Sequence, residues 1–177
     1  MKNIVLIGFM GTGKTSVGRL IAARLNRPFI DLDKKIEAEQ NTSISEIFEK
    51  YGEEKFRQIE SELIAKVSRY TNTVISTGGG AMLRYENRKR LMKNSVIVSL
   101  TASVETIIER TSRTNKRPLL DVENKEEKIS KLLQERSAIY GQADYIIDTS
   151  FYSMQHVAEK IIADLRQGGY LRGRVLG

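Results

Sequence analysis

The sequence predicts a three-layer α/β protein, in which helices cover both faces of a five-stranded parallel sheet. Three observations lead to this fold class. Short apolar runs typical of buried strands alternate with longer segments of helical spacing, which indicates βαβ units. The first apolar run ends in a glycine-rich turn that opens a helix, and three consecutive glycines follow the third run. Because ligands bind beyond the carboxyl ends of such strands, these turns are where a functional site is expected.

The first two strands and the helix between them follow from local pattern. Lys2–Ile7 is expected to be a buried strand, because its last four residues are all apolar. Lys14–Leu25 is expected to be a helix, because its apolar residues recur at helical spacing. Asn26 to Pro28 end this helix, and Phe29–Asp31 is the second strand.

A long helical region and a third strand come next. Asp33–Tyr70 is expected to be helical in several pieces, with interruptions near Asn41 and Gly52. Thr73–Ser76 is expected to be the third strand, and it leads into the glycines of Gly78–Gly80. Three glycines at the end of a strand permit a ligand to approach the backbone closely, although a flexible turn is the alternative.

The C-terminal half completes the alternation of strands and helices. Ser95–Leu100 is expected to be the fourth strand and Ser103–Arg110 the helix after it. Lys125–Gly141 is expected to be helical, Asp144–Ile147 to be the fifth strand, and Met154–Leu165 to be a final amphipathic helix. Segment 111–124 is polar and has no clear period, which is typical of a lid.

Length and composition limit the function classes. The 177 residues suit one domain, expected at 1–167, with a flexible tail at 168–177. The chain has no cysteine, which excludes disulfides and thiolate metal sites. Met1 leads directly into a strand pattern and no apolar run reaches about 18 residues, so we expect a cytoplasmic protein without a membrane partner.

The chain is basic, with a formal net charge of +7. Much of the excess lies in the stretch from Arg84 to Lys93 and near the C-terminus. A basic chain can bind nucleic acid, but it can equally bind small anions such as nucleotides and carboxylates. No aromatic residues are interleaved with these charges as a stacking platform, so we expect a solvated face and no nucleic-acid partner.

The first glycine-rich turn carries the most specific motif. Gly8–Thr15 matches the pattern G-x-x-x-x-G-K-[ST] and lies between a strand and a helix, as a phosphate-binding loop requires. Its glycines let successive N–H groups face a phosphate, and the helix N-terminus adds positive potential. The residues expected to bind a nucleotide and its Mg²⁺ are Gly11, Thr12, Gly13, Lys14, Thr15 and Ser16.

Two carboxylates come at the end of the second strand. Strand periodicity places Asp31 and Asp33 on one face, directed toward the cleft near Lys14. Since two like charges repel, Mg²⁺ or Lys14 is expected to compensate them. The alternative is one helix N-cap, with Asp33 as the candidate, and one solvated acid.

Three arginines are candidates for contact with an anionic substrate. Arg57 and Glu60 lie three residues apart on a helix, so the glutamate can hold the guanidinium for a bidentate carboxylate contact. Arg136, on a later helix near Tyr140, is a second candidate. Arg117 lies inside segment 111–124, where lid closure would bring it to a transferring phosphate. The alternative for each helical arginine is a surface position.

Together these residues are similar to the shikimate kinase family over about Met1 to Leu165. The motifs occur in the family's order and at close to its spacing. They are Gly8–Thr15, Asp31-x-Asp33, Phe56-Arg57-x-x-Glu60, Gly78-Gly79-Gly80, Arg117-Pro118-Leu119-Leu120 and Arg136. The resemblance implies a nucleoside-monophosphate-kinase-like fold with sheet order 2-3-1-4-5 and a mobile lid. It also implies transfer of the γ-phosphate of ATP to the 3-hydroxyl of shikimate with Mg²⁺, a step of aromatic amino acid synthesis.

On the acceptor side, the resemblance implies that Asp33 holds the ring hydroxyls and is the candidate base. It implies that Arg57 and Arg136 clamp the carboxylate and that Gly79, between Gly78 and Gly80, meets the substrate through its backbone. The residues that resemble the apolar wall of the pocket are Ile44, Phe48 and Phe56.

On the nucleotide side, the resemblance implies that Arg117 lies on the phosphates and that Arg110 lies over adenine. The strand before the glycines carries no acidic residue, so Asp31 is the expected carboxylate near Mg²⁺, through water. The lid also holds Arg113 and Lys116, and Thr149 to Tyr152 follow the fifth strand where the adenine loop is expected. We expect a monomer.

Two other function classes stay open from the residues alone. A related small kinase could act on gluconate or on a nucleoside monophosphate. Two arginines aimed at a carboxylate favour shikimate over a neutral sugar, and the stacking groups that a nucleobase acceptor needs are not found. A nucleotide-binding regulatory module that engages nucleic acid would account for the charge, and steep salt dependence of binding would identify it.

Overall fold

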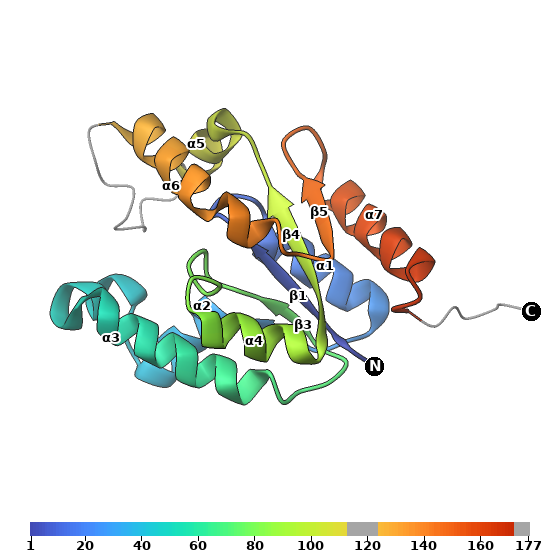
Figure 1. Ribbon diagram of the computed structural model, residues 1–177, viewed down its shortest axis with the longest axis horizontal. Helices are drawn as coiled ribbons and strands as arrows, with labels where there is room; N and C mark the ends of the chain where they lie inside the picture. Colours follow the sequence, from blue (N-terminus) through green and yellow to red (C-terminus); the bar gives the residue numbers. More distant parts are fainter. Residues whose placement is uncertain (113–123, 172–177) are drawn as a thin grey trace, which may run out of the picture.

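The computed structural model describes residues 1–112 and 124–171. Its centre is a five-stranded sheet in the order β2-β3-β1-β4-β5, and every pair of neighbouring strands is parallel (Figure 1). The strands are β1 (Asn3–Gly8), β2 (Phe29–Asp31), β3 (Val74–Ser76), β4 (Ser95–Thr101) and β5 (Tyr145–Asp148). The predicted fold class and strand order are confirmed.

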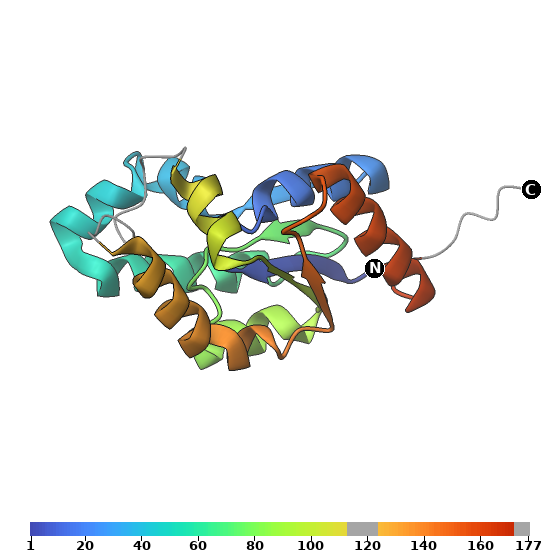
Figure 2. The ribbon, with the colours of Figure 1, turned by 90° about the horizontal axis from the view of Figure 1, so that it is seen from above.

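Helices cover the sheet on both faces. They are α1 (Lys14–Leu25), α2 (Leu32–Gln40), α3 (Ile44–Val67), α4 (Tyr85–Lys93), α5 (Val104–Ser112), α6 (Lys125–Tyr140) and α7 (Met154–Gln167). Figure 2 shows α1 and α7 side by side on one face and α4 and α6 on the opposite face. The three-layer arrangement follows from a sheet that is apolar on both sides.

The alternation of side chains along β1 divides the core in two. Ile4 and Leu6 pack with α1 and α7, whereas Val5 and Ile7 pack with the helices of the other face. All four side chains are buried, which explains the uninterrupted apolar run in the sequence. Because β1 pairs with both β3 and β4, the loops after β1 and β3 leave the sheet side by side.

The predicted interruptions of the long helical region are confirmed. Asn41 caps α2 in the left-handed conformation with φ 52°, and α3 begins three residues later. Gly52 has φ 78° and ψ 170° inside α3, where it kinks the helix. These two breaks fold α2 and α3 back on each other beside the carboxyl ends of β2 and β3 (Figure 1).

Helix α4 was not expected from the sequence. Only Asn87 and Leu91 of its residues are buried, so it shows almost no apolar periodicity. Asn87 is held by tertiary structure, since its side-chain amide donates to the carbonyl of Ala81 at 3.1 Å. The basic stretch from Arg84 to Lys93 is therefore largely a helix lying on the sheet.

Two of the expected segments overlap residues that the structure describes. Helix α5 continues to Ser112, so the segment expected at 111–124 begins with helical residues, and 113–123 lie outside the described residues. Tyr170 and Leu171, which fall within the tail expected at 168–177, pack against the core, and 172–177 lie outside the described residues. In the described part of the chain, no helix combines the length and apolarity needed to span a membrane.

Candidate active site

The loop between β1 and α1 has the geometry of a phosphate-binding site. The ammonium group of Lys14 is buried in the loop and donates to the carbonyls of Gly8 at 2.9 Å and Phe9 at 2.8 Å. A Cβ atom on Gly8, which has φ 137°, would lie 2.2 Å from the carbonyl oxygen of Leu100. Only glycine therefore fits where the loop leaves the sheet.

The first turn of α1 opens into this loop. Its N-cap is Gly13, which has no side chain to satisfy the amides of the first turn. Thr12 turns its hydroxyl inward, donating to the carbonyl of Phe9 at 2.8 Å, so this side chain stabilises the loop. The N-terminal amides of α1 and the ammonium of Lys14 thus lie together, an arrangement that suits an anion.

The two carboxylates after β2 lie in different local structures. Asp31 ends β2 and is the N-cap of α2, where its Oδ1 accepts from the amide of Lys34 at 3.2 Å. Asp33 lies in the first turn of α2, so the prediction that strand periodicity aligns the pair was wrong, as was the choice of Asp33 for the cap. Both side chains nevertheless line the same cleft, because the helix turns Asp33 back toward the strand end.

Two adjoining cavities form this cleft. The smaller, of about 360 Å³, is lined by the phosphate loop and by Arg110. The larger, of about 920 Å³, extends over α2, α3 and the glycines after β3. The residues that line both are Thr15, Asp31, Asp33 and Gly79. A nucleotide in the first cavity and an acceptor in the second would therefore meet beside the two carboxylates.

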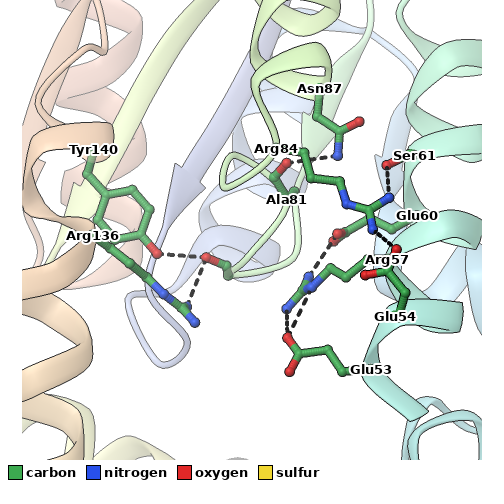
Figure 3. Close-up of polar contacts among 11 residues, drawn as sticks. Glu53, Glu54, Arg57, Glu60, Ser61, Ala81, Arg84, Asn87, Arg136 and Tyr140 are labelled. Carbon is green, nitrogen blue, oxygen red and sulfur yellow. Dashed lines mark hydrogen bonds and ion pairs between the residues drawn. The ribbon is translucent and has the colours of Figure 1, made fainter.

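Arg57 is a buried cation in the wall of the larger cavity. Its Nη1 donates to Glu60 Oε2 at 2.8 Å, and its Nη2 donates to Glu53 Oε1 at 3.2 Å, as Figure 3 shows. Burial alone would lower the pKa of Arg57, but the carboxylates of Glu60 and Glu53 raise it overall. The predicted Arg57–Glu60 pair is confirmed as a contact, and it holds the guanidinium in one orientation.

Glu60 is the most deeply buried carboxylate of the cleft, with 1% of its surface exposed. Burial raises its pKa, the charge of Arg57 opposes this shift, and the nearby Asp33 adds to it. The 2.8 Å contact with an arginine, which stays protonated in proteins, favours the charged pair. Gly78 leaves room for these acids, since a Cβ there would lie 2.7 Å from Asp33 Oδ1.

A second buried arginine reaches the cleft from the opposite side. Arg136 extends from α6, and its Nη1 donates to the carbonyl of Gly79 at 3.2 Å. Its guanidinium also lies over the ring of Phe9, with 5.5 Å from Cζ to the ring centroid. Figure 3 shows Arg136 and Arg57 extending toward each other from opposite sides. The two predicted carboxylate-binding arginines are therefore brought to one pocket.

Arg110 connects the phosphate loop to the segment after β5. Its Nη1 donates to the carbonyl of Gly11 at 3.2 Å and to Thr149 Oγ1 at 2.9 Å, and its Nη2 donates to the carbonyl of Thr149 at 2.7 Å. Thr149 is fully buried and donates in turn to the carbonyl of Thr12 at 2.9 Å. Arg110 therefore lines the smaller cavity, beside the phosphate loop.

The apolar residues expected in the pocket wall lie there. Ile44, Phe48 and Phe56 line the larger cavity, and the rings of Phe48 and Phe56 have centroids 4.9 Å apart. Met10 of the phosphate loop lines it as well. Arg117 lies outside the described residues.

Sequence reasoning named Thr149 and Tyr140 in passing but gave neither residue a role in the site. Thr149 follows β5 directly at the carboxyl edge of the sheet, which is the signal that could have found it. The hydroxyl of Tyr140 donates to the carbonyl of Gly79 at 2.7 Å. Arg136, one helical turn earlier, donates to the same carbonyl at 3.2 Å. The four-residue spacing indicates that both lie on one face of α6, but their shared partner is set by the fold.

The oxygen atoms near the phosphate loop suit Mg²⁺, which usually takes only one or two ligands from the protein. Within residues 1–112 and 124–171, no three acidic, histidine or cysteine side chains are grouped as a metal cage. The hydroxyl of Thr15 donates to Asp31 Oδ2 at 2.6 Å at the edge of the smaller cavity. Mg²⁺ commonly takes one or two such oxygens and completes its octahedron with phosphate oxygens and water.

Comparison with known proteins connects this geometry to one family. The family model described as shikimate kinase matches residues 10–166. A shikimate kinase of Thermodesulfovibrio yellowstonii is 54% identical over 164 residues, which cover 93% of this chain and 95% of that protein. A shikimate kinase of Caldanaerobacter subterraneus is 51% identical over 162 residues, covering 92% and 95%.

A solved structure agrees with the sequence relatives. The shikimate kinase from Acinetobacter baumannii in complex with shikimate is 39% identical and superposes with a TM-score of 0.92, covering 97% of this chain and 96% of that chain.

Proposed function

The chain belongs to the shikimate kinase family, and on that premise we propose that it transfers the γ-phosphate of ATP to the 3-hydroxyl of shikimate. The observation that carries this proposal is the pair of adjoining cavities. One is built on a phosphate loop, and the other is lined by two buried arginines, with two carboxylates at the junction. A carboxylate on the acceptor can accept hydrogen bonds from both arginines, whereas a neutral sugar cannot, which disfavours a neutral sugar as the acceptor.

The acceptor is oriented by its carboxylate. Arg57 and Arg136 approach the larger cavity from opposite sides, so a carboxylate between them receives hydrogen bonds from both. This places the ring hydroxyls toward Asp33 and the glycines Gly78 and Gly79. Asp33 then orients the reacting hydroxyl and accepts its proton as the new bond to phosphorus forms.

The nucleotide is bound by backbone and by fixed cations. The amides of Gly11, Thr12, Gly13, Thr15 and Ser16 face the phosphates. The ammonium of Lys14 leaves the carbonyls of Gly8 and Phe9 for the β- and γ-phosphates, where it stabilises the charge that develops during transfer. Arg110 offers the face of its guanidinium to adenine, because its edges are occupied by Gly11 and Thr149. Arg117 is proposed as a further cation on the phosphates.

Mg²⁺ is part of the proposal, and the chain's own oxygens fit it. The Thr15 hydroxyl would coordinate the ion directly, and the Asp31 carboxylate would hold one of its water ligands. When bound, the ion would supply positive charge that offsets the negative charge of the phosphates. With or without the ion, the residues of the chain orient the acceptor and accept the proton of its hydroxyl.

The proposal extends to the state of the protein in the cell. We propose that residues 1–167 act as one kinase domain, that the protein is a cytoplasmic monomer, and that ATP and shikimate are its partners. The positive net charge is then a property of a solvated surface with a cleft for anions.

One assay tests the proposed function. ADP release is measured by a coupled reaction with shikimate, gluconate and nucleoside monophosphates as acceptors, using the wild type and Lys14→Met. We expect turnover with shikimate only, and a loss of about 10³-fold in Lys14→Met, as for removal of a transition-state cation. Equal rates with gluconate, or undiminished rates in the variant, would refute the proposal.

A further inference from the structure

The last residue of α6, Tyr140, contacts the glycine loop directly. Its hydroxyl donates to the carbonyl oxygen of Gly79 at 2.7 Å, and Arg136 Nη1 donates to the same oxygen at 3.2 Å. Figure 3 shows the two dashed lines converging on this oxygen from one helix. A backbone carbonyl has two lone pairs, so it can accept both bonds at once. Tyr140, Arg136 and Gly79 therefore form a single unit at the wall of the acceptor cavity.

The contact is buried and stays a donor contact at physiological pH. Only 7% of the Tyr140 surface is exposed. Burial raises the pKa of the Tyr140 phenol, and the charge of Arg136 opposes the shift without cancelling it. The phenol thus keeps the proton with which it donates to Gly79.

The glycine loop needs an external support of this kind. Three successive residues without side chains have wide backbone freedom. Within the loop, the amide of Ala81 donates to the carbonyl of Gly78 at 3.2 Å. Across the described residues, the amides of Gly79 and Gly80 donate no hydrogen bond, so the carbonyl of Gly79 is the point at which the rest of the fold holds the middle of the loop.

The geometry of the peptide bond means that holding the Gly79 carbonyl also sets the orientation of the Gly80 amide. The C=O of Gly79 and the N–H of Gly80 belong to one planar trans unit and point opposite ways. Holding the oxygen against α6 therefore directs the Gly80 amide away from α6, toward the side where Arg57 lies. Gly80 is in close contact with that arginine, since a Cβ there would lie 2.4 Å from Arg57 Nη2.

We propose that Tyr140 is a positioning residue for the acceptor: by holding the Gly79 carbonyl, it fixes both the Arg136 guanidinium and the amides of the glycine loop. This inference rests on the proposed function, because the acceptor is the molecule that meets these groups. It assigns Tyr140 no contact with ATP. Loss of its hydroxyl therefore weakens acceptor binding and leaves nucleotide binding unchanged.

The first test is Tyr140→Phe, which keeps the ring and removes one hydrogen bond. We expect the KM for shikimate to rise roughly 3- to 10-fold, as for the loss of a single hydrogen bond. The KM for ATP should stay within about twofold of the wild-type value, less than the effect of one hydrogen bond. Tyr145→Phe is the matched control, because Tyr145 also donates to a backbone carbonyl, that of Asp164 at 3.3 Å, outside the cleft. An equal rise of both KM values, or no change, would overturn the inference.

A double-mutant cycle separates positioning from general destabilisation. If Tyr140 acts through Arg136, then Tyr140→Phe should raise the shikimate KM less in the Arg136→Lys background than in the wild type. Additive effects would mean that the two residues do not act as one unit, and the inference would fail. Absence of shikimate phosphorylation by the wild type would refute the proposed function instead, so the two failures are distinguishable.

Should Tyr140→Phe fail to fold, a fluorinated tyrosine at position 140 keeps the shape and the hydrogen bond. Fluorination lowers the phenol pKa, so the donor proton is lost at a lower pH than in the wild type. We expect the shikimate KM of this variant to rise at an alkaline pH where the wild-type KM is still constant. Identical pH profiles of the two proteins would overturn the inference.

Discussion

The hydroxyl of Thr15 and the carboxylate of Asp31 are joined by a 2.6 Å hydrogen bond. Thr15 lies in the first turn of α1 and Asp31 at the end of β2, so the bond links the phosphate loop to the acceptor side of the cleft. Asp31 also caps α2, whose first turn carries Asp33. The proposed Mg²⁺ ligand and the proposed base are thereby held by one carboxylate.

This relationship predicts different consequences for the two acids. Asp31→Asn should raise the Mg²⁺ concentration needed for half-maximal turnover by about 10-fold, as for loss of an outer-sphere ligand. Asp33→Asn should reduce turnover by roughly 10²- to 10³-fold at any Mg²⁺ concentration, since asparagine can orient a hydroxyl but cannot take its proton. Turnover is measured against Mg²⁺ and shikimate for both variants.

The two variants serve as each other's control. Both replacements remove one charge from the same cleft and keep the size of the side chain, so a purely electrostatic effect would be similar in the two. Rescue of Asp33→Asn by excess Mg²⁺, with no rescue of Asp31→Asn, would mean that the two roles are reversed.

Arg57→Lys should weaken acceptor binding selectively. Lysine keeps the charge but cannot make two parallel hydrogen bonds to a carboxylate while also contacting Glu53 and Glu60. We expect the shikimate KM to rise about 10- to 100-fold, the range for charge-assisted hydrogen bonds, and the ATP KM to change little. The matched control is Arg24→Lys, which alters an exposed ion pair with Glu159 away from the cleft. An equal rise in both KM values would indicate that Arg57 is structural.

The glycine loop allows a prediction in which stability and function separate. A Cβ on Gly80 would lie 2.4 Å from Arg57 Nη2, whereas a Cβ on Gly79 meets nothing closer than 3.5 Å. Because the atoms that a Cβ would meet belong to the end of a side chain and not to backbone, Gly80→Ala should displace the Arg57 guanidinium from its carboxylate partners without unfolding the protein. We expect a melting temperature within about 4 °C of wild type and a raised shikimate KM.

Gly79→Ala is the matched control for this loop, because it adds the same methyl group in ordinary contact distance. It should change the shikimate KM less than Gly80→Ala does. The reverse order of effects would show that the Arg57 guanidinium does not depend on the space that Gly80 leaves.

Glu46 should make the acceptor region sensitive to acid. Its carboxylate accepts from the amide and the hydroxyl of Ser43 and from Thr42, which lowers its pKa from 4.5 to about 2. Because the pKa of Glu46 is lower in the folded protein than the 4.5 of the unfolded chain, its charged form stabilises the fold at pH values above 4.5. This stabilisation is lost as the pH falls toward about 2, where the folded protein takes up the proton. The melting temperature of Glu46→Gln should therefore be below that of wild type at pH 6, and the difference should vanish near the folded pKa.

Thermal unfolding from pH 6 to acid pH checks this prediction. Glu49→Gln is the control, since Glu49 is an exposed acid of α3 that forms no hydrogen bond with Thr42 or Ser43. A gap between Glu46→Gln and wild type that persists unchanged into acid would show that the hydrogen bonds between Ser43 and Glu46 do not depend on the carboxylate charge.

Several of these features could be predicted from sequence because their causes are local. The phosphate loop of Gly8–Thr15 is formed by consecutive residues, so the sequence motif is enough to predict its backbone geometry. The Arg57–Glu60 contact follows from spacing within one helix. Helix α4 could not be predicted, because Asn87 and Leu91 alone face the core and charged residues fill the remaining positions.

The acids after β2 mark the limit of a local argument. The residues 31 and 33 fit strand periodicity, yet the capping bond from Lys34 to Asp31 begins a helix between them. Both interpretations place the side chains at the cleft, so the site was anticipated while its local structure was not. Strand periodicity carries no information on the capping bond to Asp31 or on the packing of α2 against α3, and both accompany the helix that forms here.

The sequence by itself determined the alternation of strands and helices, the phosphate loop and the helical arginine–glutamate pair, because each depends on residues close in the chain. Only the tertiary structure decided that Arg136 and Tyr140 share the carbonyl of Gly79, 57 and 61 residues away. It likewise decided that Arg110 meets Thr149, 39 residues further on. Such contacts form where parallel strands end side by side, and strand order in a sheet is set by the burial of both its faces, which no single segment encodes.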